Sequence, residues 1–276
     1  MAIITVMLAD VQLYQVSVKK EGYSMKTMKK VLSLAVVAAM ALSVFACSEE
    51  TPAETTEAAV DYEYMSYDEY EAAALDTEVT VLCTVMATQS WWEDQITVYA
   101  QAFDGDGAYF IYNMACSEED AEGVGEGATI LVTGFKSEWE GEIEITDATF
   151  EFTDLVQENP MAPVDLTADF GNDDALIANQ NRNFTMTGLT VEASGDNGEA
   201  FLYSWDGSGS QGDDLYFTVS NGESTITFTV ESYLTGADTD VYQAVEALNV
   251  GDTIDVSGFL YWYQGANPHI TGVTVN

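Results

Sequence analysis

One nine-residue pattern occurs twice in the chain, and it constrains the fold more than any other feature. Residues 127–135 read GATILVTGF and residues 251–259 read GDTIDVSGF, at the constant spacing that separates Gly127 from Gly251. Each copy alternates apolar and polar residues, and a short polar segment and a second alternating run follow it. This arrangement predicts a strand, a turn and another strand. We therefore expect two copies of one β-domain.

The segments before the two copies also correspond. Residues 78–87 and 184–192 are alternating runs, and the first places Val79, Val81, Cys83 and Val85 on one face. Two further β-rich runs and a short helical segment follow each of them, at 95–102, 108–112 and 117–121 and at 215–220, 225–232 and 238–248. A capping box from Ser66 to Glu69 predicts a helix before the first copy, and residues 172–180 are its counterpart.

Three strands, a helix and two strands follow one another in the order of the OB-fold, a five-stranded barrel. The G-D-x-I-x-V-x-G run at 251–258 resembles the fourth strand of many bacterial OB domains, although Ala128 replaces the Asp in the first copy. The chain resembles the acidic OB-like lipoproteins of Gram-positive bacteria. The resemblance implies an all-β protein with short helices, built from two tandem OB-like five-stranded barrels. A pair of β-sandwiches would give similar alternation and remains an alternative.

The N-terminal segment is predicted to be a targeting signal. Residues 25–47 contain three lysines, an apolar run and then Ala46 and Cys47. This order resembles a bacterial lipoprotein signal, which implies cleavage before Cys47 and a diacylglycerol on its sulfur. Two acyl chains suffice for stable anchoring. A single anchor helix is the alternative, but the apolar run is shorter than a membrane span.

These features divide the chain into segments. Pro160 and Pro163 interrupt the periodicity between the copies. Residues 19–22 resemble a translated ribosome-binding site, which makes Met25 the expected start. The predicted segments are a signal region at 1–46 (with 1–24 upstream of the start), Cys47 and an acidic tether at 47–63, and OB-like domains at 64–157 and 158–276.

The charge of the chain is strongly negative. Seven Lys and Arg residues stand against 47 Asp and Glu residues, a formal net charge of −40. Beyond residue 30 only Lys136 and Arg182 are basic. A surface of this sign repels phosphate backbones and anionic lipid headgroups, so the sequence ranks nucleic acid last among the partner classes.

The sequence carries no enzyme motif. It lacks H-E-x-x-H, G-x-S-x-G, a P-loop and C-x-x-C, so we expect no catalysis, no cofactor and no dedicated metal site. His269 is interpreted as a structural or surface histidine. The Asp- and Gly-rich segments at 104–107 and 206–214 are interpreted as loops, with loose divalent binding left open. For Cys83 and Cys116, a buried free thiol at Cys83 is favoured over a disulfide.

Aromatic residues fall in the loops that flank the ligand face of an OB barrel. Flat rings beside carboxylates and amides suit sugars or peptides. The alternative is that these rings fill a barrel end or the seam between the domains. The candidate ligand-binding residues are Trp91, Trp92, Lys136 and Trp139 in the first copy and Trp205, Tyr261, Trp262, Tyr263 and Asn267 in the second.

The sequence thus predicts an extracytoplasmic, lipid-anchored, non-catalytic binding module. Its expected ligand is a glycan or a peptide, and its expected membrane contact is the lipid on Cys47. A structural lipoprotein that docks an envelope protein is the second hypothesis, and an OB-type nucleic-acid binder is the third.

Overall fold

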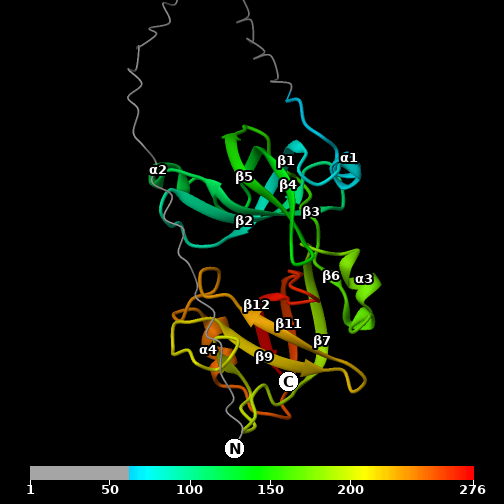
Figure 1. Ribbon diagram of the computed structural model, residues 1–276, viewed down its shortest axis with the longest axis vertical. Helices are drawn as coiled ribbons and strands as arrows, with labels where there is room; N and C mark the ends of the chain where they lie inside the picture. Colours follow the sequence, from blue (N-terminus) through cyan, green and yellow to red (C-terminus); the bar gives the residue numbers. More distant parts are fainter. Residues whose placement is uncertain (1–61) are drawn as a thin grey trace, which may run out of the picture. The chain divides into compact units, whose positions relative to one another are not determined.

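The structure is a computed structural model, and it describes residues 62–276. The signal region, Cys47 and most of the predicted tether lie outside the described residues. Within 62–276, none of the helices has the length and apolar character needed to cross a membrane. The described part consists mainly of strands, with a few short helices (Figure 1).

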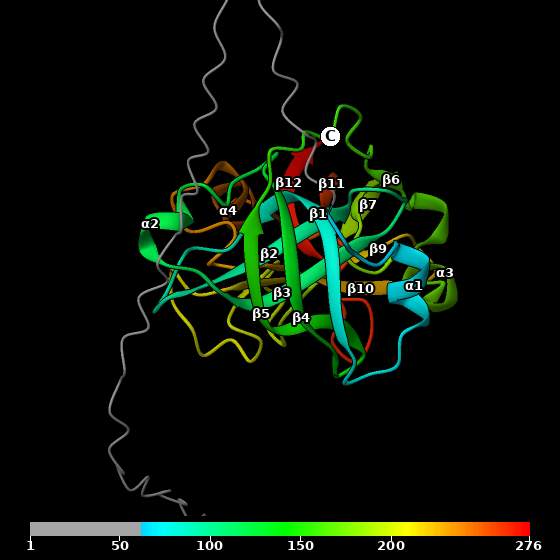
Figure 2. The same ribbon diagram turned by 90° about the horizontal axis from the view of Figure 1, so that it is seen from above.

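The first half of the described chain forms a closed five-stranded barrel. Its strands are β1 (Glu78–Thr88), β2 (Gln95–Ala102), β3 (Ala108–Ala115), β4 (Thr129–Trp139) and β5 (Glu142–Phe152). They close in the order β1-β2-β3-β5-β4, and only the β3–β5 pair is parallel. Figure 2 shows β5, β4 and β1 as neighbours, in agreement with their registers. The helix α1 (Tyr67–Ala72) precedes β1, and α2 (Glu118–Ala121) connects β3 to β4.

The second half repeats this topology. Its barrel strands are β7 (Asn183–Val191), β9 (Leu215–Ser220), β10 (Thr225–Val230), β11 (Thr253–Phe259) and β12 (His269–Val275). Pairing of β7 with β9 closes the ring, and β10–β12 is its parallel pair. The helix α4 (Asp240–Glu246) lies between β10 and β11. Additional short elements are β6 (Val164–Asp165), η1 (Thr167–Asp169), α3 (Asp173–Ile177) and β8 (Leu202–Tyr203).

The prediction of two tandem OB-like barrels is therefore confirmed, and the sandwich alternative is wrong. The strand order is the same in both halves, with three strands, a helix and two strands along the chain. The capping box also forms, since the Ser66 hydroxyl accepts from the Glu69 N–H and the Glu69 carboxylate accepts from the Ser66 N–H.

Alternation along the strands fills each barrel. In β1 the side chains of Val79, Val81, Cys83 and Val85 are all buried in the first core, on the face that the sequence assigned to them. Cys83 is a buried free thiol, as predicted, and burial raises its pKa to about 12. In the second barrel Phe217 and Phe228 meet edge to face inside the core.

The repeated glycines have structural reasons. Gly127 and Gly251 both have positive φ angles, of 87° and 95°, just before β4 and β11. Gly134 and Gly258 lie where the partner strand approaches closely, so that a Cβ atom would meet Thr146 O or His269 O. Both sit at a β-bulge, where the register with the last barrel strand shifts.

The two barrels are joined by a packed seam. The ring of Tyr99 in β2 stacks on Phe259 in β11, with centroids 4.5 Å apart. The Tyr99 hydroxyl lies 2.6 Å from His269 Nδ1. The β4–β5 turn adds polar contacts, in which Gln180 Nε2 donates to Gly141 O and Gln264 N donates to Glu140 O. The relative position of the two barrels is thus fixed by side chains of both.

A buried carboxyl group lies in this seam. Glu142 has no exposed surface, and its Oε2 accepts from Trp262 N at 2.9 Å. Its Oε1 has no hydrogen-bond partner. Burial raises the pKa of Glu142 well above its usual value, against the opposing effects of the Asn181 amide and the Trp262 N–H. The seam therefore favours the protonated form of Glu142.

We predict that Gly134→Ala and Gly258→Ala each lower the free energy of unfolding by about 2 kcal/mol or more, because the added methyl group would push against backbone of the neighbouring strand. Urea denaturation followed by circular dichroism measures this change. Gly125→Ala is the matched control, since it has open space around it and should be neutral or slightly stabilising. Equal effects at all three positions would contradict the explanation.

We also predict that Glu142→Gln raises the melting temperature more at pH 8 than at pH 5. Because the folded-state pKa of Glu142 is raised, its contribution to stability is full below the unfolded-state pKa and is lost as the pH rises toward the folded-state pKa. Glutamine cannot ionise, so the variant avoids this loss. Glu151→Gln, on the exposed side of β5, removes the same charge and is the control. Identical pH profiles for both variants would refute the prediction.

Candidate functional site

A cleft of about 1050 Å³ lies between the barrels. Equivalent elements of each barrel line it, since β2 and β3 form one wall and β9 and β10 the other. The β1–β2 loop and Trp139 at the end of β4 contribute from the first barrel, and the β7–β9 and β11–β12 loops contribute from the second. These are the strands and loops that form the ligand face of an OB-fold. The cleft is therefore bounded by two OB ligand faces.

The exposed aromatic rings of the described residues are concentrated in this cleft. All exposed tryptophans and tyrosines of residues 62–276 line the cleft: Trp92, Tyr112, Trp139, Trp205, Tyr233 and Tyr263. Trp92, Trp139 and Trp205 are 63%, 58% and 77% exposed. Exposed apolar surface gathered in one place is typical of a binding site rather than of ordinary protein surface.

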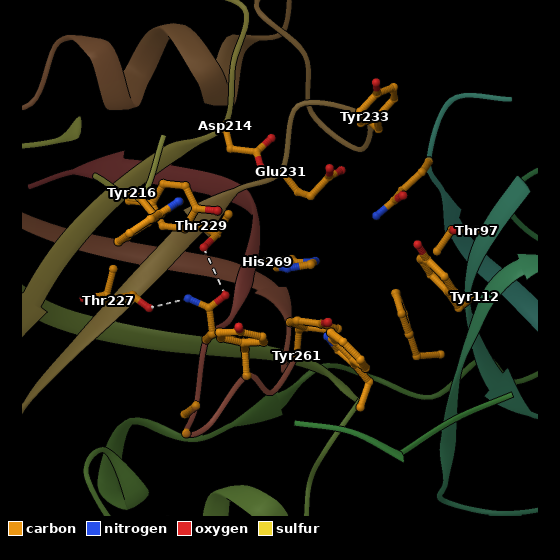
Figure 3. Close-up of a pocket in the computed structure, with 18 of the residues that line it drawn as sticks. Thr97, Tyr112, Asp214, Tyr216, Thr227, Thr229, Glu231, Tyr233, Tyr261 and His269 are labelled. Atoms are coloured by element: carbon orange, nitrogen blue, oxygen red, sulfur yellow. Dashed lines mark hydrogen bonds between the residues drawn. The ribbon is translucent and has the colours of Figure 1, made fainter. Parts of the chain in front are cut away.

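Strand alternation explains how these rings reach the cleft. In β3, Tyr109 and Ile111 point into the first core, so Phe110 and Tyr112 point out toward the cleft. In β10 the core residues alternate with Thr225, Thr227 and Thr229, which line the opposite wall. Figure 3 shows Thr97 and Tyr112 from the first barrel facing the second-barrel side chains.

A stack of rings forms the inner end of the cleft. Tyr261 stacks on His269 with centroids 4.2 Å apart, and Phe110 meets Tyr261 edge to face at 5.2 Å. Gln89 Nε2 donates to the Tyr99 hydroxyl, which in turn donates to His269 Nδ1. This assignment leaves the imidazole proton on Nε2. Burial lowers the pKa of His269 to about 3, so the ring is neutral at physiological pH.

Two carboxylates lie next to one another on the second-barrel side (Figure 3). Asp214 Oδ1 accepts from the backbone N–H and the hydroxyl of Ser232, at 2.8 and 2.7 Å. Glu231 Oε2 accepts from Leu234 N at 2.9 Å. Burial, and then the charge of Asp214, raises the pKa of Glu231 to about 7. Asp173 is the third acidic residue of the lining, and no lysine or arginine of residues 62–276 belongs to it.

Six of the nine residues that the sequence nominated line this cleft. They are Trp92, Trp139, Trp205, Tyr261, Tyr263 and Asn267. Asn267 is held in place by its neighbours, since its Nδ2 donates to Thr227 O and its Oδ1 accepts from Thr229 Oγ1.

The other three nominated residues lie elsewhere, each for a structural reason. Trp91 packs against the first core, and its indole N–H donates to Cys116 O at 2.9 Å. Trp262 is buried in the second core and lies against Gly141, where a Cβ would meet its ring. Lys136 is buried under the end of α1, where its ammonium group donates to Tyr70 O, Glu71 O and Ala73 O. That lysine stabilises a helix end.

Sequence reasoning did not nominate Tyr112, Asp214, Glu231 and Tyr233. The alternation of residues 108–112 contained a signal for Tyr112, because the same pattern that buries Tyr109 and Ile111 places Tyr112 outside. The two carboxylates had no comparable signal in a chain with 47 acidic residues. Tyr233 follows β10 in an irregular segment, where no periodicity applies.

No protein-family model matches the chain, and no curated protein matches it significantly. Among solved structures, the HINa domain of Ifi202 in complex with a 20-base-pair double-stranded DNA is 14% identical, with a TM-score of 0.31 over 73% of this chain and 96% of that one. A murine DNA-binding protein with double-stranded DNA is 11% identical, with a TM-score of 0.32 over 71% and 94%. The replication protein A heterotrimer bound to single-stranded DNA is 11% identical, with a TM-score of 0.30 over 75% and 51%.

These similarities correct two predictions from the sequence. The chain was expected to bind a glycan or a peptide, and nucleic acid was ranked last among partners. These three structures are of proteins bound to DNA. The glycan-or-peptide prediction and the low rank of nucleic acid as a partner are therefore withdrawn. At this identity the similarity concerns the fold, and the chain's own residues must decide its ligand.

Proposed function

We propose that the cleft between the two OB barrels binds a ligand that carries a flat ring, and that it holds this ring by stacking. One observation carries the proposal, namely that all exposed tryptophans and tyrosines of residues 62–276 line this one cleft. Stacking on exposed aromatic side chains is the usual way in which OB faces hold planar groups. A ring inserted between the walls would bury the rings of both barrels.

The cleft also offers polar groups suited to the edge of a heterocyclic ring. His269 presents a neutral imidazole at the inner end, and the hydroxyl of Tyr112 and the amide of Asn113 lie on the first-barrel wall. A few convergent polar groups in a mainly aromatic cleft give orientation to a bound ligand. The ligand we propose is therefore a heteroaromatic compound.

The proposed activity is binding without chemical conversion. His269 is the one histidine of the chain, and its Nδ1 is engaged by Tyr99 while burial keeps it from accepting a proton near neutral pH. Cys83, with a raised pKa, is enclosed in the first core, away from the cleft. These arrangements support a role in holding a ligand.

Single-stranded nucleic acid is the second candidate ligand. The observation that favours it is that the strand 2–3 faces of both barrels, where OB-folds bind oligonucleotides, face the cleft. The two described basic residues, Lys136 and Arg182, are occupied by groups of the protein itself. Binding of an oligonucleotide here would therefore depend on base stacking, and its affinity would not fall with salt in the usual way.

We further propose that the protein acts outside the cytoplasm, tethered through a lipid on Cys47. The support is the order of basic, apolar and small residues in 25–47 and the acidic segment that follows. The tether would hold the cleft near a membrane surface.

The stacking proposal predicts that Trp92→Ala combined with Trp139→Ala weakens ring binding by about tenfold or more, since stacking contributes roughly 1–3 kcal/mol per ring. Isothermal titration calorimetry would use quinoline, N-methylquinolinium, quinoline-2-carboxylate and a single-stranded oligothymidylate. Phe135→Ala is the control, because Phe135 is also exposed but lies outside the cleft. The proposal fails if none of the four probes binds the wild-type protein, or if the double variant binds as tightly as the control.

The anchoring proposal predicts that bacteria fed an alkyne-tagged fatty acid label the full-length protein, and that Cys47→Ser abolishes the label. The variant cannot form the thioether, so it should also leave the membrane fraction. Cys83→Ser is the control, because Cys83 lies inside a barrel. Undiminished labelling of Cys47→Ser would contradict the proposal.

A further inference from the structure

We infer that the ligand of the cleft is an organic cation, in which a flat ring carries or adjoins a quaternary or protonated nitrogen. This inference rests on the proposed function, since it names the class of ring that the cleft selects. It depends on the charges and ring faces of the lining residues.

The part of the cleft lining that residues 62–276 form is negative. Asp173, Asp214 and Glu231 belong to it, and no lysine or arginine among these residues does. His269 is neutral, because burial lowers its pKa to about 3. The two basic residues of the described chain cannot move in without breaking their own contacts. Lys136 donates to three carbonyl oxygens near α1, and Arg182 Nη1 donates to Asn179 Oδ1.

Aromatic faces reinforce this preference. The ring quadrupole places negative potential on each face of tryptophan and tyrosine, so that a cation within about 6 Å of a centroid is attracted. Six exposed rings and the partly buried Tyr216 and Tyr261 line the cleft. A neutral ring gains only stacking from these faces, whereas a cationic ring gains stacking and electrostatic attraction together. Rings and carboxylates in one cleft therefore favour the same ligand charge.

Asp214 and Glu231 are fixed before any ligand arrives. Backbone N–H groups hold both carboxyl groups, through Ser232 N for Asp214 and Leu234 N for Glu231. Their mutual repulsion contributes to the raised pKa of Glu231. A bound cation would offset this repulsion, so preorganised carboxylates of this kind suit a positive ligand.

Proton linkage gives the inference a distinct signature. Glu231, with a pKa of about 7, is partly protonated at neutral pH. The groups that face it are Asp214, Tyr216 of β9 and Tyr99 of β2, and burial raises the pKa of both tyrosines so that they stay neutral. A permanently charged ligand should therefore bind more tightly as the pH rises from 6 to 8, and binding should release a proton from Glu231.

The test compares N-methylquinolinium with quinoline, which has the same rings and no charge at pH 8. We expect the cation to bind about tenfold more tightly, with a preference that shrinks at high salt. Asp214→Asn and Glu231→Gln should each reduce this preference, because each removes a carboxylate charge. Both variants keep the side-chain oxygen that accepts from a backbone N–H. Glu151→Gln removes a charge outside the cleft and should leave it unchanged. The affinity of Glu231→Gln should no longer rise with pH, and binding should no longer release a proton. Calorimetry in two buffers measures the proton release.

The outcomes separate the two proposals. If quinoline binds as tightly as N-methylquinolinium, the cation inference is wrong while ring stacking stands. If quinoline-2-carboxylate binds most tightly, the cation inference is likewise overturned. If the oligothymidylate binds most tightly, the inference is also overturned, and single-stranded nucleic acid becomes the assigned ligand class. If none of these probes binds, both proposals fail. Near-ultraviolet circular dichroism confirms that each variant keeps its fold.

Discussion

The contact of Tyr99 with Phe259 and His269 is the interaction on which the candidate site depends. Each barrel has its own core and its own closed sheet, so nothing within one barrel dictates where the other lies. The small cluster of Tyr99, Phe110 and Phe259 supplies that information, together with the hydrogen bonds around Glu142. The Tyr99 hydroxyl accepts from Gln89 Nε2 within the first barrel, whereas the buried His269 Nδ1 of the second barrel finds its partner, this hydroxyl, across the seam. Specific docking thus follows from polar atoms that need partners.

The acidity of the chain has different consequences in different places. Over most of the surface, carboxylates are solvated and serve solubility. In the seam, Glu142 is enclosed, and burial raises its pKa well above the usual value. At the cleft, Glu231 lies between these extremes because burial is partial and Asp214 is near. The pKa of the same kind of side chain therefore differs between the solvated surface, the seam and the cleft, according to local burial.

Sequence reasoning recovered the architecture because that architecture repeats. It was predicted from local patterns that have direct structural causes. These are the runs that contain Gly134 and Gly258, the alternation around Cys83 and the capping box at Ser66. The predicted residues that line the cleft lie in loops or at strand ends, as Trp92 does in the β1–β2 loop and Trp139 at the end of β4. Trp91 and Trp262 look equivalent to them in sequence, but each packs against the core of its own barrel and does not line the cleft. The Trp91 indole N–H also donates to the Cys116 carbonyl. Lys136 seemed a ligand contact because it is rare, whereas its role depends on the end of a helix more than sixty residues away. Such long-range contacts leave no local pattern.

The equivalence of the two cleft walls has a consequence for how this site could arise. Strands β2 and β3 and strands β9 and β10 hold the same place in their barrels, and the β1–β2 and β7–β9 loops correspond as well. The cleft therefore resembles one between the two subunits of a dimer, except that both of its walls belong to the same chain. The two halves belong to one chain but differ in sequence, so a substitution can change one wall without changing the other. The three acidic residues of the described lining, Asp173, Asp214 and Glu231, all belong to the second half, whereas the exposed rings come from both halves. A dimer of identical chains could not have this asymmetry.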